Sequence, residues 1–312
     1  VDLLGTFKTE KNLYISSFLM HALVIALVII SPVLSSKFGF SSSDIKSKGV
    51  NLLGNNDTTY QRRSLSELSL SYYGGPVLTT INVVPVFYNS DVQYQSEILN
   101  YYNALISGGD FIAFLDSEYG SSVLQSGVKV NYGSVGSSCN LMMAQSEQSD
   151  EQIRAILVDS FSDSAGVLPT PTDNTVYAIH MPPGVRVADT FHTYSCQMWC
   201  SYHSSFKWGS TNIYYIVVPD QGGACSMGCG SDPLPLNNLY SIISHEIAET
   251  ITNPAVGIAS GIGPPLSWWS AVFGEVADAC GDAEDFVTLG DGNRYVVHRL
   301  WSNSRNMCVK PA

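Results

Sequence analysis

The chain has 312 residues and a formal net charge of −12, with 45% hydrophobic and only 13% charged residues. This composition excludes a disordered chain and predicts a sizeable buried core. Nucleic acid is not an expected partner, because the sequence holds no basic run beyond Arg62-Arg63. An acidic, lightly charged chain rich in Ser, Gly and Tyr is typical of a secreted protein.

The N-terminal region predicts export. Residues 18–30 form an apolar run interrupted by His21, with two lysines before it and small residues after it. This three-part pattern is typical of a secretory signal peptide, to which we assign residues 1–36. The stretch 14–34 is also long enough to span a bilayer, so a signal anchor in a membrane is the alternative.

Residues 37–70 are Ser-rich and carry scattered charges, which predicts a linker or pro-segment. The single glycosylation acceptor of the chain, Asn56-Asp57-Thr58, falls in this segment, where a surface position is expected. We expect one globular domain over residues 71–312.

Hydrophobic patterns predict alternating strands and helices in this domain. The strands are expected at residues 77–88, 128–132, 175–181 and 213–218, and the helices at residues 92–106, 149–161 and 237–252. Ser149 is the expected N-cap of its helix, with Gln152 completing a capping box. A hairpin is expected around Gly290-Asp291-Gly292. The prediction is an α/β (α+β) fold in which a mixed sheet is flanked by helices.

The most informative pattern is Ser244-His245-Glu246-Ile247-Ala248-Glu249-Thr250. In a helix, His245 and Glu249 are four residues apart and lie on one face, where both can bind a single cation. Glu246 is the adjacent carboxylate. The layout is that of the zinc-hydrolase helix H-E-x-x-H with its second His replaced by Glu, so we expect a zincin-like active-site helix that ends at Asn253-Pro254.

A catalytic zinc has three protein ligands and an open position for water. We predict His245, Glu249 and Glu275 as ligands, by similarity to zincins whose third ligand is a Glu on a later helix. Glu246 is the predicted general base, and Asp278 the residue that accepts a hydrogen bond from His245. One His with two carboxylates neutralises Zn²⁺, and an oxygen-rich site also suits Mn²⁺ or Ca²⁺.

Other interpretations of these residues remain open. A His–Glu pair on an amphipathic helix is often a solvated surface pair, and Glu275 could cap a helix. Trp268 and Trp269 could line a substrate platform if exposed, or belong to the core if buried. His203 could line the substrate site or bind the metal. Alternatively, it is a hydrogen-bonded His beside a disulfide.

Seven cysteines follow the apolar segment. In an exported chain, disulfides are favoured over a zinc ribbon, whose pairs usually have C-x-x-C spacing. The disulfide candidates are Cys196, Cys200, Cys225, Cys229, Cys280 and Cys308. Cys280 with Cys308 is the first pairing we predict, and Cys139 is the expected free thiol.

Several short motifs in a fixed order resemble the phosphate-induced protein/EXORDIUM-like family over residues 72–309. They are Tyr73-Gly74-Gly75-Pro76-Val77, Cys200-Ser201-Tyr202-His203-Ser204, Cys225-Ser226-Met227-Gly228-Cys229, Thr252-Asn253-Pro254, residues 275–280 and Trp301-Ser302-Asn303 before Cys308. The resemblance implies a secreted protein of the cell wall or apoplast. Bacterial-type relatives are similar in keeping His-Glu-x-x-Glu, whereas many plant members lack the His-Glu pair.

We therefore predict a secreted metal-dependent hydrolase, with a zinc peptidase as the first choice. Its partner would be a peptide or a component of the cell wall or extracellular matrix. The alternative is a non-catalytic extracellular protein that binds carbohydrate or a protein partner. A membrane-bound form of either requires that residues 14–34 are retained.

Overall fold

The computed structural model describes residues 69–120, 128–162 and 166–311. The predicted signal segment, nearly all of the Ser-rich linker and the glycosylation acceptor at Asn56 lie outside the described residues. Within the described ranges, no helix has the length and apolarity needed to cross a membrane.

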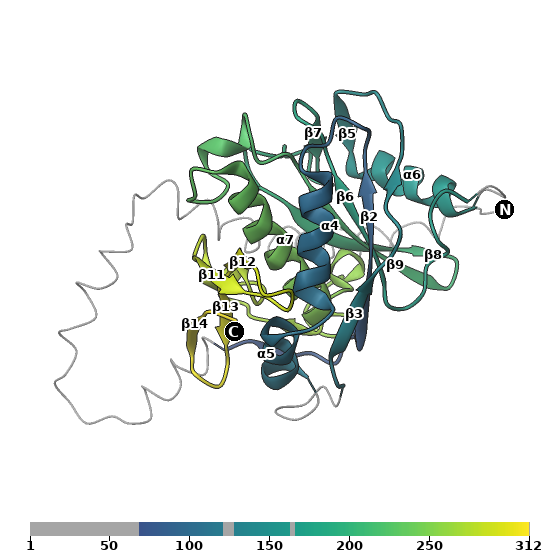
Figure 1. The fold of residues 1–312 in the computed structure, drawn as a ribbon. Helices are drawn as coiled ribbons and strands as arrows, with labels where there is room; N and C mark the ends of the chain where they lie inside the picture. The colour runs from purple at the N-terminus through teal and green to yellow at the C-terminus, as the bar shows by residue number, and fades with distance from the viewer. Residues whose placement is uncertain (1–68, 121–127, 163–165, 312) are drawn as a thin grey trace, which may run out of the picture. The chain divides into compact units, whose positions relative to one another are not determined.

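A six-stranded mixed sheet forms the centre of the fold (Figure 1). Its strands are β2 (Thr80–Phe87), β3 (Asn131–Val135), β4 (Cys139–Asn140), β6 (Thr175–His180), β8 (Tyr202–Trp208) and β9 (Thr211–Val218). The order is β3-β2-β6-β9-β8, and β4 also pairs with β2. All neighbouring pairs are parallel except β8–β9, which is antiparallel. The predicted mixed sheet is confirmed, with an antiparallel strand at one edge.

Buried Val, Ile and Tyr side chains explain why the central strands form. Every residue of β6 is buried, as is most of β2 and β9, because parallel strands are covered on both faces. Pro85 lies inside β2, where a strand tolerates it least. It falls between Val83, where pairing with β3 ends, and Val86, where pairing with β4 begins. No strand pairs with the proline on that side.

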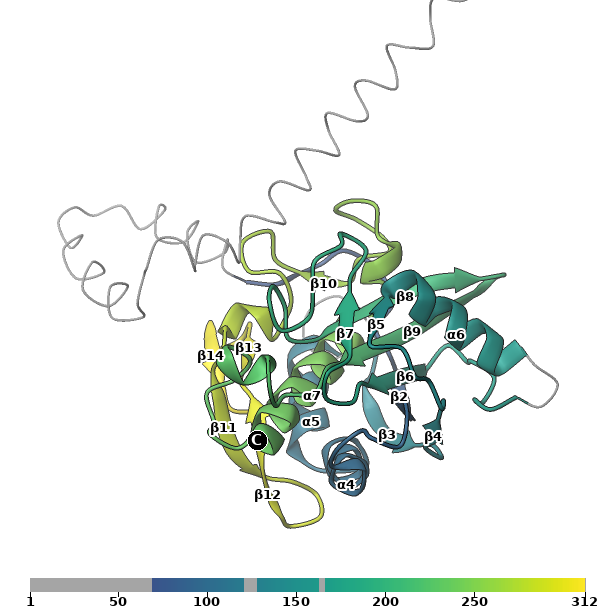
Figure 2. The ribbon, with the colours of Figure 1, turned by 90° about the horizontal axis from the view of Figure 1, so that it is seen from above.

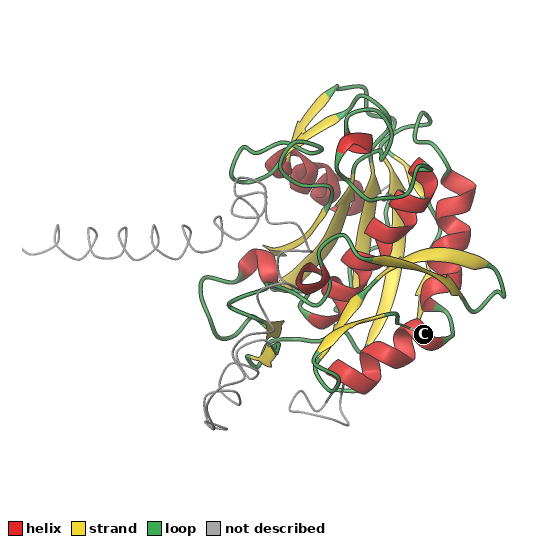
Figure 3. Cartoon of the chain, turned by 90° about the vertical axis from the view of Figure 1, so that its left-hand side faces the viewer, coloured by secondary structure: helices red, strands yellow, loops and turns green. Residues whose placement is uncertain are grey.

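Within the described residues, four α-helices flank the sheet, and Figure 3 shows helices beside its strands. They are α4 (Gln95–Ile106), α5 (Asp110–Tyr119), α6 (Asp150–Ser162) and α7 (Pro235–Thr252). The predicted capping box at the start of α6 is present: the Ser149 backbone N–H donates to Gln152 Oε1 at 2.8 Å and the Gln152 N–H donates to Ser149 Oγ at 3.2 Å. The helix α5 was not expected from the sequence.

The edge strand β8 shows which face each helix covers. The Tyr202 hydroxyl donates to Asp150 Oδ1 of α6 at 2.8 Å, whereas the next residue, His203, contacts Glu246 of α7. Successive side chains of a strand point to opposite faces. Accordingly α6 and α7 lie on opposite faces of the sheet, as the view in Figure 2 also shows.

Smaller two-stranded units complete the fold. They are β1 (Ser71–Tyr72) with β10 (Trp268–Trp269), β5 (Glu147–Ser149) with β7 (Arg186–Ala188), β11 (Glu284–Thr288) with β12 (Arg294–His298), and β13 (Leu300–Ser302) with β14 (Met307–Val309). Three short 3₁₀ helices also occur, η1 (Cys225–Met227), η2 (Val256–Ile258) and η3 (Asp278–Cys280). The β11–β12 hairpin confirms the predicted hairpin around Gly290-Asp291-Gly292, and it packs against α7.

Three disulfides join the six predicted cysteines. The pairs are Cys196–Cys225, Cys200–Cys229 and Cys280–Cys308, and Cys139 is the free thiol. Cys196–Cys225 and Cys200–Cys229 connect the segment before β8 to the segment before α7. The disulfides are typical of an oxidising, extracellular setting.

Candidate metal centre

The helix α7 carries the His-Glu pattern through the interior of the protein. It begins with Pro235 in its first turn, a favoured position for proline, and ends where the Asn253 N–H donates to Glu249 O at 2.7 Å. Most of the helix is buried, including the carboxylates of Glu246 and Glu249. The interpretation of the His–Glu pattern as a solvated surface pair is therefore wrong. Each buried carboxylate needs a partner.

Three side chains meet at an opening to solvent. His245 Nε2 lies 3.2 Å from Glu249 Oε2 and 3.5 Å from Asp278 Oδ1. The exposed fractions of the three side chains are 20% for His245, 4% for Glu249 and 46% for Asp278. We call these three residues the open cluster. Its ligand atoms all lie within 4.8 Å of one another, so the cluster could hold a metal ion.

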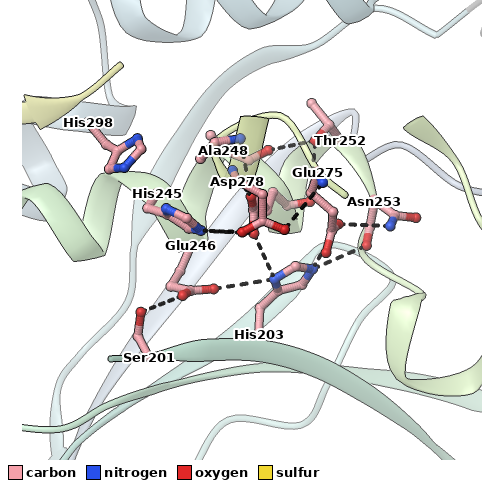
Figure 4. A network of polar contacts seen from close by, with 12 residues as sticks. Ser201, His203, His245, Glu246, Ala248, Thr252, Asn253, Glu275, Asp278 and His298 are labelled. Carbon is pink, nitrogen blue, oxygen red and sulfur yellow. Dashed lines mark hydrogen bonds and ion pairs between the residues drawn. The ribbon is translucent and has the colours of Figure 1, made fainter. Parts of the chain in front are cut away.

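A second cluster lies deeper, around His203 of β8 (Figure 4). His203 Nδ1 lies 3.7 Å from Glu249 Oε2, and His203 Nε2 lies 3.4 Å from Glu275 Oε1. These three residues, the closed cluster, are all buried and could also hold a metal ion. Glu249 belongs to both clusters.

The structure thus divides the predicted ligand set. His245 and Glu249 are together in the open cluster, but Glu275 belongs to the closed cluster with His203. Asp278, predicted to accept a hydrogen bond from His245, lies beside it and also occupies the third corner of the open cluster. Glu275 Oε1 also accepts a hydrogen bond from Asn253 Nδ2 at 2.8 Å, which fixes it on the side of His203.

The loop after β10 holds Glu249 and Asp278 in place. Glu249 Oε1 accepts the backbone N–H groups of Ala277 at 3.1 Å and Asp278 at 3.0 Å, which leaves Oε2 to face His245 and His203. Asp278 Oδ2 accepts the Glu275 N–H at 3.3 Å. Gly274 has a φ of +83°, and a Cβ there would lie 2.6 Å from Asp278 Oδ2. Only glycine fits this turn without strain.

Crowded carboxylates perturb the proton affinities of both clusters. Burial, followed by the charge of Asp278, raises the pKa of Glu249 to about 8. Burial also raises the pKa of Glu275, although His203 opposes this shift. Without a cation nearby, these shifts favour the protonated form of both carboxyl groups.

The pKa values of the two imidazoles, His203 and His245, are also raised, but for a different reason. Burial alone would lower their pKa values, but the neighbouring carboxylates prevail and raise them well above the usual range. Glu249 has this effect on His245, and Glu275 and Glu246 have it on His203. The pKa of Asp278 is lowered because its interaction with His245 outweighs its desolvation.

The formal charge of the centre favours a cation. With all four carboxylates ionised, Glu246, Glu249, Glu275 and Asp278 contribute −4, and protonation of His203 and His245 would reduce this only to −2. Among the described residues, no Lys or Arg forms an ion pair with these carboxylates. A buried net charge is unfavourable by several kcal/mol, on the order of the penalty for each unpaired ion. A divalent cation would offset it.

Sequence reasoning missed three residues of the centre. Ser201 Oγ donates to Glu246 Oε1, and Asn253 donates to Glu275. His298 packs edge-on against His245 with ring centroids 4.7 Å apart. Ser201 could have been inferred from its position two residues before His203, since alternate strand residues share a face. No sequence signal indicates His298.

The tryptophan platform needs correction. Trp268 is only 2% exposed, and its Nε1 donates to the Tyr119 carbonyl at 2.9 Å. Its ring packs against Tyr72 and Tyr119. Trp268 is therefore a core residue that cannot line a substrate site, because the β1–β10 pair buries it. Trp269 is half-buried.

Together, the fold and the site define a disulfide-linked α/β protein with a candidate metal centre at the C-terminal part of α7. No protein-family model, no curated protein and no solved structure matches the chain.

Proposed function

We propose that the chain is a secreted metal-dependent hydrolase, with peptides as its first substrate class. The observation that carries the proposal is the convergence of His245 Nε2, Glu249 Oε2 and Asp278 Oδ1 at a position that solvent can reach. A catalytic metal requires such an opening, because one coordination position must remain free for water or substrate.

The open cluster suits this role better than the closed cluster. His203, Glu249 and Glu275 are all buried, which is typical of a structural site with no access for substrate. We therefore assign Asp278 as the third ligand in place of Glu275. A neutral imidazole and two carboxylates neutralise a divalent cation, and zinc is the metal we propose, since His and carboxylate are both common zinc ligands.

A bound zinc would lower the pKa of a coordinated water toward about 7. Glu246, next to His245 on α7, would take a proton from this water and later deliver it to the leaving group. Its carboxylate is buried, which excludes competing bulk water, and hydrogen bonds from the β8 side fix it. The layout His-Glu-x-x-Glu with a later Asp supports a zincin-like function.

The proposed extracellular location rests on two features. Three disulfides require an oxidising compartment to form, and residues 18–30 have the pattern of a signal peptide. The resemblance to the EXORDIUM-like family points in the same direction. A peptide or a protein of the extracellular matrix would be the substrate.

The test is metal analysis of the purified, oxidised chain together with Glu246→Gln. We expect about one equivalent of zinc in both proteins, and hydrolysis of fluorescently labelled casein by the wild type only. Loss of the general base should reduce the rate by about 10²- to 10⁴-fold. Full hydrolysis by Glu246→Gln would remove the base assignment, and a wild type that binds no divalent metal would overturn the proposal.

A further inference from the structure

We infer that His203 is the positioning residue for Glu246, a role that deepens the proposed function and rests on it. His203 lies on β8, whose alternation directs Tyr202 toward α6 and His203 toward α7. From the sequence, His203 is a candidate for the substrate-lining or metal-binding set or a hydrogen-bonded His beside a disulfide. In the structure, its ring lies between Glu246, the proposed general base, and Glu275.

The first side of the ring faces the base. His203 Nδ1 lies 3.3 Å from Glu246 Oε2, and Ser201 Oγ donates to the other carboxylate oxygen, Oε1. Both oxygens of Glu246 are therefore in contact with the segment that leads into β8 (Figure 4). The side chains of His203 and Glu246 are each only 3% exposed, so water does not compete for these hydrogen bonds.

The second side of the ring is anchored. His203 Nε2 lies 3.4 Å from Glu275 Oε1 and 3.4 Å from the Asn253 carbonyl oxygen. Glu275 is in turn held by Asn253 Nδ2 at 2.8 Å. Acceptors on both sides prevent the ring from rotating. Glu275 therefore acts through His203, and the base is linked to the end of α7 by side-chain contacts.

Such an arrangement matters for a general base. A flexible Glu side chain gains reactivity only when its oxygen is held within hydrogen-bond reach of the proton it takes. A displacement of about 1 Å can lower the rate about 10²-fold. His203 would therefore affect the chemical step while touching neither the substrate nor the proposed metal, which sits in the open cluster.

Two substitutions separate the two sides of the ring. Asparagine places its amide nitrogen close to the position of Nδ1, and glutamine places its own close to that of Nε2. We expect His203→Asn to keep kcat within a few-fold of the wild type, because the contact with Glu246 survives. We expect His203→Gln to lower kcat about 10- to 100-fold, with KM for a casein-derived peptide and zinc content unchanged. His192→Asn, at an exposed loop position, is the control and should behave as the wild type.

Equal losses of kcat in His203→Asn and His203→Gln would overturn the inference. Loss of zinc from both variants would also overturn it, since His203 would then be a ligand.

A second measurement does not depend on activity. If His203 holds Glu246, the Tm loss in the double variant His203→Gln/Glu246→Gln should be smaller than the sum of the two single losses. Additive losses would overturn the inference even for a protein without hydrolase activity. Absence of metal and hydrolysis in the wild type would instead reject the proposed function, while the Tm comparison still decides the role of His203.

Discussion

Asp278 Oδ1 lies 3.5 Å from His245 Nε2, whereas Glu275, three residues earlier, faces His203 on the other side of Glu249. The two acidic residues of one loop thus contact two different imidazoles. This division decides where a cation would bind, and it can be tested by neutralising each carboxylate in turn.

Asp278→Asn should weaken zinc binding by at least about 100-fold, because it removes a direct ligand of the open cluster. Glu275→Gln should weaken it by about 10-fold or less, since Glu275 would act only from outside the ligand set. Competition with a chromogenic chelator measures both affinities. The reverse order would place the cation in the closed cluster.

The stability of the metal-free protein should fall as the pH rises. Folding raises the pKa of Glu249 from 4.5 to about 8, so its contribution to stability is fully present below about pH 4.5 and lost above about pH 8. His245, whose pKa is also raised, acts in the same direction. Burial lowers the pKa of His180 to about 3 and that of His298 to about 4, which acts in the opposite direction below about pH 6.5. Tm measured in chelator from pH 7 to 9 should therefore decrease.

Two comparisons check this interpretation. Glu249→Gln should flatten the decrease, because the titrating carboxyl is gone. Added zinc should oppose the decrease, since the metal binds the deprotonated groups and stabilises the folded state. A metal-free Tm that rises between pH 7 and 9 would contradict the assignment of the raised pKa.

Gly274→Ala should disrupt the loop that carries Asp278. The new Cβ would lie 2.6 Å from Asp278 Oδ2 in addition to adopting an unfavourable φ of +83°. Gly184→Ala is the matched control, because Gly184 has a φ of +80° with no atom within 4 Å of the added Cβ. We expect about 1–3 kcal/mol of destabilisation from backbone strain at either site, and a loss of zinc affinity for Gly274→Ala only. Equal zinc affinity in the two variants would argue against the role of this turn.

The disulfide Cys200–Cys229 should support the centre as well as the fold. It closes a span of 29 residues, and loss of a disulfide with a loop of this size typically lowers stability by about 3 kcal/mol. Cys200 precedes Ser201, so we also expect the double variant Cys200→Ser/Cys229→Ser to lose hydrolysis. Cys139→Ser, which alters the free thiol, should leave Tm and activity unchanged. Denaturant unfolding and casein hydrolysis measure the two effects.

Local signals in the sequence predicted much of the fold. The capping box at Ser149, the apolar run of β6 and the stop at Asn253-Pro254 each depend on neighbouring residues, and the structure confirms them. The edge strand β8 was missed. Its sequence, Tyr-His-Ser-Ser-Phe-Lys-Trp, mixes aromatic and polar residues without a regular apolar alternation, a pattern that does not distinguish a strand from a loop.

The arrangement of the centre depended on contacts that no spacing rule describes. Helical periodicity brought His245 and Glu249 together, because four residues on a helix fix their geometry. The loop of Glu275 and Asp278 has no such period: it turns at Gly274 and then forms the short 3₁₀ helix η3. Their positions in the sequence therefore did not show which of the two acidic residues faces His245 and which faces His203. His203 itself lies on a strand about 40 residues before the helix motif.

The disulfide Cys280–Cys308 has a consequence for biosynthesis. The acidic loop that completes the open cluster is anchored to the β13–β14 hairpin, and this covalent link exists only once residue 308 has been translated and oxidised. A nascent or prematurely terminated chain would therefore present the motif helix without a secured third ligand. If the chain is the secreted hydrolase that we propose, incomplete polypeptides would then be inert, and neighbouring proteins would be protected from cleavage until maturation.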